Sequence, residues 1–259
     1  MKTDSIISNI PHSLINLGII LPSQEESKQL DERGYVILPN IMKKDQCQKM
    51  GVYLDELEGQ VPIETELKNF QVEAGTTRFA NLIDQGSIMD IFWSHPRLLG
   101  CVWHIINRDF KVSSLNAREP KLGQGHQGLH ADVSSRLVDQ PANQAVNCLW
   151  LLDGMTKENG ATRFIPGSHK IIGKPSDYMK NTLDPHPDEI SVVAPQGAVV
   201  VYNAHSWHSG ATNHSGARRR VLHAFYTARE NPQQQLQKKW LSNATKSRLD
   251  SDRCWLLDI

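Results

Sequence analysis

Two residues that can bind a metal ion, His130 and Asp132, stand two positions apart in the segment 124–133. Side chains two positions apart on a β-strand project from the same face, so an imidazole and a carboxylate at this spacing can converge on one point. Such a pair makes two thirds of the facial triad of two histidines and one carboxylate that holds non-haem Fe(II) and leaves coordination positions open. The triplet alone is a common pattern, and a metal site needs a third ligand from elsewhere in the chain.

The best source of a third ligand is the segment 202–210, which contains His205 and His208. Spacing alone does not choose between these two histidines. The same set of ligands can also hold Zn²⁺ with an open position for an activated water, as in a metal-dependent hydrolase. A third interpretation is a cupin-like binding module without catalytic activity, in which the cluster holds no metal.

Charge and cysteine content narrow the class of partner. The 259 residues carry 28 Lys and Arg against 28 Asp and Glu, a formal net charge of zero. This balance argues against a nucleic-acid or membrane partner and favours a small-molecule substrate. The four cysteines form no C-x-x-C pair, and no apolar run is long enough to span a bilayer, so we expect a cytoplasmic protein, either a monomer or a homodimer.

The first part of the chain has helical patterns. Ser23 and Glu26 have the spacing of a capping box, and Gly34 is placed to end the helix that they begin. A strand is expected over 35–38. Helical spacing of apolar residues then predicts a second helix around 47–57 and a third over 96–106.

After residue 107 the pattern changes to short apolar runs divided by turn residues. Strands are expected near 110–116, 128–133, 145–152, 161–165, 190–193, 198–202, 207–209 and 220–226. About eight short strands after a group of helices predict a mainly β fold, a double-stranded β-helix or jelly roll of the cupin type, and argue against a parallel sheet.

The length favours a single domain over residues 1–259. Its expected parts are a helical N-terminal support to about residue 108, a jelly-roll core over about 109–230 and a helical tail over about 231–259, with one helix across 232–243. The irregular segments 61–75, 134–143 and 171–189 are expected to be the loops that choose the substrate.

Four blocks follow one another along the chain: QGLHAD at 127–132, WLLD at 150–153, ENGATRFIPGSHK at 158–170, and HSGATNHS at 208–215 with arginines at 218–220. Together they resemble the phytanoyl-CoA dioxygenase family of Fe(II)- and 2-oxoglutarate-dependent oxygenases. The resemblance covers most of the chain, because Gly34-Tyr35-Val36 also looks like the opening of the family pattern. It implies that His130, Asp132 and His208 are the iron ligands.

The resemblance also chooses between the two candidate histidines, since only His208 aligns Asn213 and Ser215 with the residues that follow the family's distal histidine. It further implies that Arg219 anchors the distal carboxylate of 2-oxoglutarate, for which a guanidinium offers a bidentate partner. Strand alternation would turn the two arginines beside Arg219 away and bring 221, 223 and 225 inward with it.

Four further residues are candidates for the pocket. By the resemblance, Gln127 and Thr162 bind the cosubstrate through hydrogen bonds, and Trp150 packs against it. Gln127 has the wrong parity to share a strand face with His130, so Gly128 would have to kink the chain. Asn81 is a candidate substrate contact.

The activity that the resemblance implies is that of an oxidoreductase. Fe(II), 2-oxoglutarate and O2 would together oxidise a C–H bond of a small molecule, with hydroxylation as the default outcome and succinate and CO2 as products. Halogenation is not expected, because halogenases related to the family replace the ligand carboxylate that Asp132 supplies here. A natural-product intermediate, as in secondary metabolite biosynthesis, is the expected substrate.

Overall fold

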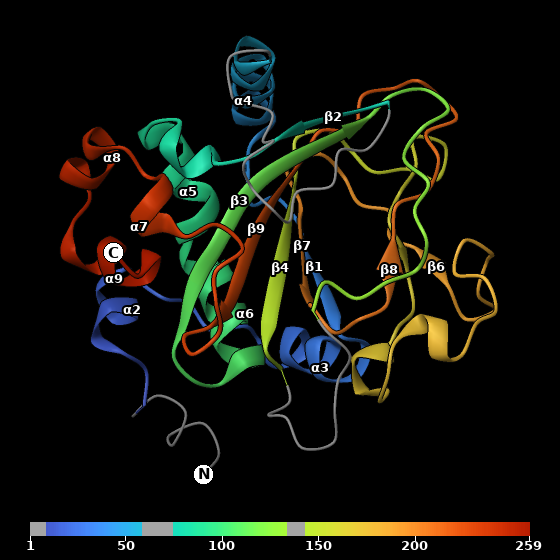
Figure 1. The fold of residues 1–259 in the computed structure, drawn as a ribbon, viewed down its shortest axis with the longest axis horizontal. Helices are drawn as coiled ribbons and strands as arrows, with labels where there is room; N and C mark the ends of the chain where they lie inside the picture. The colour runs from blue at the N-terminus through green and yellow to red at the C-terminus, as the bar shows by residue number, and fades with distance from the viewer. Residues whose placement is uncertain (1–8, 59–74, 134–142) are drawn as a thin grey trace.

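The computed structural model describes residues 9–58, 75–133 and 143–259 of the chain. Apart from two 3-10 helices, its helices lie before residue 107 or after residue 236 (Figure 1). The α-helices are α2 His12–Asn16, α3 Gln24–Arg33, α4 Lys44–Leu57, α5 Asp90–Ser94, α6 Pro96–Ile106, α7 Gln237–Trp240, α8 Asn243–Arg248 and α9 Ser251–Leu257, and the 3-10 helices are η1 Leu82–Asp84, η2 Ser87–Met89, η3 Ser168–Lys170 and η4 Pro175–Asp177. None of the helices in these described parts is long and apolar enough to cross a membrane.

The strands form two antiparallel sheets. They are β1 Tyr35–Leu38, β2 Thr76–Phe79, β3 Phe110–Pro120, β4 Ala145–Leu151, β5 Arg163–Phe164, β6 Ile190–Ser191, β7 Val199–Asn203, β8 His208–Ser209 and β9 Val221–Ala228. The larger sheet has the order β1-β7-β4-β9-β3-β2, and the smaller has the order β6-β5-β8. The predicted jelly-roll fold of the cupin type is confirmed.

The predicted N-terminal elements are confirmed with their signals. Ser23 and Glu26 cap α3 reciprocally, and Gly34 ends it at φ 82°, a left-handed conformation that glycine adopts without strain. The next residue begins β1, which pairs with β7. Helix α4 buries Cys47 and Met50 along the predicted apolar face.

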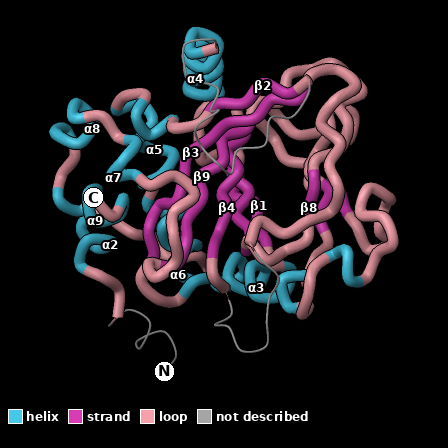
Figure 2. The backbone as a smooth tube through the Cα atoms, in the orientation of Figure 1, coloured by secondary structure: helices cyan, strands magenta, loops and turns pink. Residues whose placement is uncertain are grey.

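The two faces of the larger sheet have different surroundings. Most helices lie on one side of it, and the short strands β6 and β8 lie on the other (Figures 1 and 2). Because side chains alternate along a strand, Cys148 and Trp150 of β4 belong to the apolar core on the helical side, whereas Asn147 faces the other side.

Two predicted elements are wrong. The strand expected over 128–133 is reduced to one bridge between His130 and His208. The helix expected over 232–243 is only α7, because the preceding residues run along β3: Gln234 N donates to Ser113 Oγ (2.7 Å) and Gln233 Nε2 to Val112 O (2.8 Å). The predicted loops at 61–75 and 134–143 fall almost entirely outside the described residues.

Candidate active site

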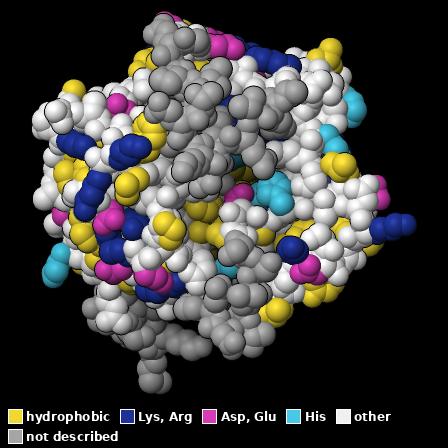
Figure 3. All heavy atoms as spheres, in the orientation of Figure 1, with side chains coloured by type: hydrophobic (Ala, Val, Ile, Leu, Met, Phe, Trp, Pro, Cys, Tyr) yellow, Lys and Arg dark blue, Asp and Glu magenta, His cyan; other side chains and the backbone are white. Residues whose placement is uncertain are grey.

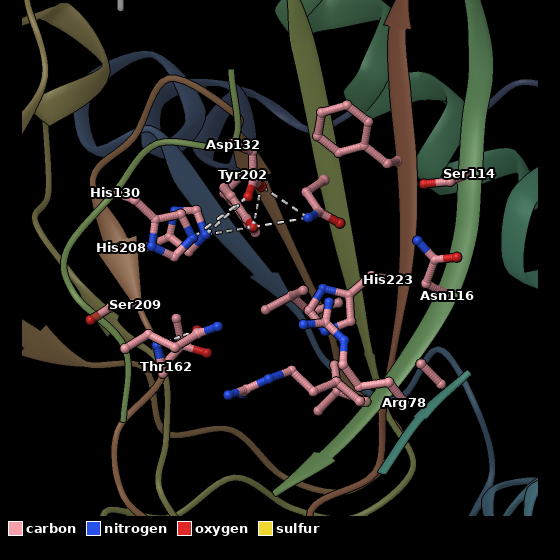
Figure 4. A pocket seen from close by; sticks show the side chains of 18 of the residues that line it. Arg78, Ser114, Asn116, His130, Asp132, Thr162, Tyr202, His208, Ser209 and His223 are labelled. Carbon is pink, nitrogen blue, oxygen red and sulfur yellow. Dashed lines mark hydrogen bonds and ion pairs between the residues drawn. The ribbon is translucent and has the colours of Figure 1, made fainter. Parts of the chain in front are cut away.

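Three side chains with metal-binding atoms converge on the inner side of the larger sheet: His130, Asp132 and His208 (Figure 4). One ligand atom from each lies within 4.8 Å of the others. The bridge that replaces the predicted strand sets this arrangement, since His130 N donates to His208 O (3.0 Å) and His208 N to His130 O (2.8 Å). Asp132 is held by its own backbone bond to Ala204 O (3.0 Å).

Backbone carbonyls orient the two imidazoles. His130 Nδ1 lies 2.8 Å from Gly128 O, and His208 Nδ1 lies 3.0 Å from Ser206 O. A carbonyl oxygen only accepts hydrogen bonds, so in each ring Nδ1 carries a proton and Nε2 is the nitrogen that faces the cluster. These Nε2 atoms lie 3.9 Å and 3.4 Å from Asp132 Oδ1.

The other carboxylate oxygen of Asp132 is already engaged. Asp132 Oδ2 accepts from Tyr202 Oη (2.7 Å) and from Asn147 Nδ2 (3.0 Å), as the dashed lines in Figure 4 show. Asn147 Nδ2 also donates to Tyr202 Oη (3.0 Å). Two donors on Oδ2 leave Oδ1 to face the histidines, which suits a carboxylate that binds a metal through one oxygen.

The charges of the cluster follow from this packing. Burial alone would raise the pKa of Asp132, but the facing His208 lowers it well below its usual range. For His208 burial opposes protonation, and the Asp132 carboxylate nevertheless raises its pKa. Burial and the neighbouring His208 lower the pKa of His130. Asp132 is therefore ionised and His130 neutral, which are the forms that bind a metal cation, and His208, whose pKa is raised, binds a metal only after it loses its second proton.

The donor set fits Fe(II). Two imidazole nitrogens and one carboxylate oxygen make the facial triad of non-haem iron enzymes, which leaves positions for a cosubstrate and oxygen. His205, the competing histidine, points away from the cluster: its Nε2 accepts from Gln144 N at 3.4 Å. The geometry favours His208.

A cavity of about 170 Å³ extends from the cluster, and the predicted cosubstrate residues Gln127, Thr162 and Arg219 line it. Arg219 is only 3% exposed and donates to Gly160 O. Its neighbours turn outward as alternation predicts: Arg218 pairs with Asp55 and Glu119, and Arg220 with Asp153.

Strand alternation also predicted that residues 221, 223 and 225 face the same side as Arg219. Val221, His223 and Phe225 do line the cavity with Arg219. Burial lowers the pKa of His223 to about 3. His223 is therefore a neutral hydrogen-bonding group at neutral pH and adds no positive charge to that of Arg219.

Gln127 reaches the cavity without sharing a strand face with His130. Its side-chain Oε1 accepts from Gly210 N (3.1 Å), and its backbone oxygen accepts from Arg163 Nη2 (3.0 Å). The chain is irregular before His130, so the parity conflict does not arise. Thr162 Oγ1 lies 3.8 Å from Met155 Sδ, beside the cavity.

Two predicted pocket residues lie elsewhere, and these expectations are corrected. Trp150 is fully buried on the helical side of β4, where its Nε1 donates to Phe92 O (2.9 Å), so it cannot pack against a cosubstrate in the cavity. Asn81 precedes η1 at φ 51°, and its Nδ2 reaches Trp240 O (3.4 Å) outside the residues that line the cavity.

Several cavity residues were not predicted: Tyr202, Asn147, Asn116, Arg118 and Arg78. Asn147 had a usable signal, because it is the one polar residue within the apolar run 145–151. The other four sit in segments whose pairing is not visible in the sequence.

Comparison with known proteins identifies relatives of this chain. The family model described as phytanoyl-CoA dioxygenase (PhyH) matches residues 30–221. "Dioxygenase af480" of Aspergillus fumigatus is 27% identical over 224 residues, 80% of this chain and 68% of that protein. The peroxisomal phytanoyl-CoA dioxygenase of Rattus norvegicus is 21% identical over 79% of this chain and 68% of its own length.

Among solved structures, HygX from Streptomyces hygroscopicus with nickel and 2-oxoglutarate bound has the same fold. Its TM-score is 0.68 at 16% identity, over 83% of this chain and 90% of HygX. The epimerase SnoN, in complex with Fe3+, alpha ketoglutarate and nogalamycin RO, is similar with a TM-score of 0.60 at 16% identity, over 79% of this chain and 83% of SnoN.

Proposed function

Since the chain belongs to the phytanoyl-CoA dioxygenase family, we propose that it hydroxylates a C–H bond of a small organic molecule. The enzyme is a dioxygenase whose cofactors are Fe(II) and 2-oxoglutarate, with O2 as the oxidant. The observation that carries the proposal is the convergence of His130, Asp132 and His208 at a cavity that Arg219 also lines.

When bound, iron and 2-oxoglutarate supply the oxidising power, and succinate and CO2 are the by-products. The chain supplies position and charge. His130 and His208 present fixed Nε2 atoms, and Tyr202 with Asn147 keeps Asp132 in the orientation that binds through one oxygen. These contacts orient the metal ligands before the metal arrives.

Arg219 is proposed to pair with the distal carboxylate of 2-oxoglutarate. A buried anion needs a charged partner, and the guanidinium can donate two parallel hydrogen bonds to it. Gln127 and Thr162 line the same cavity and are proposed to bind the polar atoms of the cosubstrate. The retained carboxylate of Asp132 favours hydroxylation over halogenation.

The proposed substrate is a natural-product intermediate. It is supported by similarity to several fungal dioxygenases, among them af480 and the dioxygenase trt7 of Aspergillus terreus. We further infer one domain over residues 1–259 that works in the cytoplasm as a monomer or homodimer, with neither nucleic acid nor membrane as partner. Balanced charge and four free cysteines, Cys47, Cys101, Cys148 and Cys254, support this inference.

The test is the conversion of 2-oxoglutarate to succinate. Purified protein should form succinate only when Fe(II) and O2 are both present, and His208→Ala should abolish the reaction. His205→Ala is the matched control and should retain it. Succinate formation that survives in His208→Ala, or a protein active with Zn²⁺ and indifferent to 2-oxoglutarate, would contradict the proposal.

A further inference from the structure

A second and larger cavity, of about 470 Å³, adjoins the first, and Asp132, Phe225 and Gln234 line both. Its volume lies within the range of sites for small organic ligands, roughly 300–1,000 Å³. We name it the outer chamber. In the space-filling view a hollow near the centre of the face shows histidine and acidic side chains beside apolar ones (Figure 3).

The outer chamber offers no uncompensated charge among the described residues. The described residues that line it include no Lys or Arg, and its acidic residues are Asp132 and Glu230. Glu230 is neutralised by Arg108, whose Nε donates to Glu230 Oε1 at 2.8 Å, and Asp132 is engaged in the metal cluster. A charged group entering the outer chamber would lose water without gaining a counter-ion from the described residues that line it.

Gln234 has a fixed amide orientation at the junction of the two cavities. Ser114 Oγ donates to Gln234 Oε1 at 2.7 Å, and the backbone of Gln234 donates to Ser113 Oγ at 2.7 Å. The Nε2 group of Gln234 donates to none of the residues that the structure describes, so this amide N–H remains for a ligand that accepts a hydrogen bond.

The side-chain amide of Asn231 also has a fixed orientation, but here the NH2 group is bonded and the oxygen stays available. Thr227 Oγ1 donates to Gln144 O (3.4 Å), so it accepts from Asn231 Nδ2 (3.2 Å), and the same Nδ2 donates to Gln144 Oε1 (2.9 Å). With Nδ2 so engaged, Asn231 Oδ1 receives no hydrogen bond within the described parts of the chain. It remains for a ligand that donates one.

We propose that the outer chamber holds the substrate, and that the substrate is a neutral, oxygen-bearing hydrocarbon skeleton. A carbonyl or ether oxygen of the substrate accepts from Gln234, and a hydroxyl group donates to Asn231. This inference rests on the proposed function and extends it to a substrate class. It disfavours acyl-CoA thioesters in the outer chamber, because their phosphates would find no cation among the described residues that line it.

The test uses a matched pair of probes, estradiol 17-acetate and estradiol 17-sulfate, which share a skeleton and a free hydroxyl group and differ chiefly in charge. Equilibrium dialysis measures their dissociation constants with the apo-protein and with the anaerobic Fe(II)–2-oxoglutarate protein. We expect the neutral ester to bind at least about tenfold more tightly than the sulfate. Equal or tighter binding of the sulfate, or no binding of either probe below millimolar concentration, overturns the proposal.

Variants locate the binding. Gln234→Ala should weaken the ester about fivefold, as expected for one hydrogen bond, and Gln234→Arg should improve sulfate binding about tenfold by adding a cation. Gln48→Arg, an exposed change on α4, is the control and should alter neither. A sulfate affinity that Gln48→Arg improves as much as Gln234→Arg would show surface binding only and overturn the assignment.

The two proposals fail separately. Absence of an iron–2-oxoglutarate complex would refute the proposed function, while dialysis with the apo-protein would still report on the outer chamber. Normal succinate formation with a preference for the sulfate would refute the neutral substrate class alone.

Discussion

The two faces of the larger sheet use the same strands for opposite purposes. On the helical face, Trp150 and Tyr226 each send their one polar group to a backbone carbonyl, and the surroundings are otherwise apolar. On the cavity face, Asn147 and Tyr202 bond to each other and to Asp132, which leaves ligand atoms directed at a shared space. Residues on the helical face thus stabilise the fold, and the residues that alternate with them hold the candidate metal ligands in place. Variants on the two faces should therefore affect stability and metal binding separately.

The largest expected effect is on the helical face. Trp150→Ala should lower the free energy of unfolding by about 3–5 kcal/mol, because it removes a fully buried indole and its hydrogen bond. Urea denaturation measures the loss. Metal affinity should change less than about threefold where the variant is folded. A fall in metal affinity without a loss of stability would place Trp150 at the site after all.

Arg219 and Arg220 are adjacent residues that face opposite sides. Arg219→Met should weaken 2-oxoglutarate binding roughly a hundredfold, or about 3 kcal/mol, because the distal carboxylate loses its charged partner. Arg220→Met, which breaks a pair with Asp153, should leave that affinity within about threefold. Calorimetric titration with 2-oxoglutarate compares the two variants. A larger loss of affinity in Arg220→Met than in Arg219→Met would show that Arg219 is not the anchor.

Protonation of His223 on the cavity face should make the stability of the protein depend on pH. Its folded pKa of about 3 lies below the unfolded value of about 6.5, so the unfolded chain binds more protons and stability falls as the pH drops below 6.5. Between pH 7 and pH 5 the free energy of unfolding of the apo-protein should fall by about 1–2 kcal/mol more than that of the His223→Gln variant. Denaturation at both pH values checks this, and identical losses in the two proteins would refute it.

The smallest expected effect is on Fe(II) affinity, and it compares two buried tyrosines on opposite faces of the sheet. Tyr202→Phe should weaken Fe(II) binding about tenfold, because Asp132 loses one of the donors that orient it. Tyr226→Phe removes the hydroxyl that donates to Trp93 O (3.0 Å) on the helical face and should leave metal affinity unchanged. Competition with a chelator measures both constants. Equal affinities in the two variants would deny Tyr202 a positioning role.

Much of this arrangement could be predicted from local signals in the sequence. The capping box at Ser23 and the alternation that places Arg219 and His223 on one side depend on periodicity and short-range geometry. The fold class followed from helices that precede short strands. These features need no knowledge of which segments pair.

The predictions were wrong or incomplete where contacts between distant segments determine the position of a residue. Parity places Trp150 on the opposite face from Asn147, but which face of β4 meets the cavity depends on its pairing with β7 and β9. Tyr202 was missed for the same reason. The segment 232–236 could not be told from a helix, because its glutamines bond to β3, more than a hundred residues earlier.

The central claim is that His130, Asp132 and His208 hold Fe(II) together with 2-oxoglutarate in the cavity. The most direct measurement is an anaerobic titration of the apo-protein with Fe(II) and 2-oxoglutarate, followed by the visible charge-transfer band of the chelate. The account predicts a band at one equivalent of each in the wild type and in His205→Ala, and none in His208→Ala. No band in the wild type, or a band that disappears in His205→Ala and survives in His208→Ala, would contradict it.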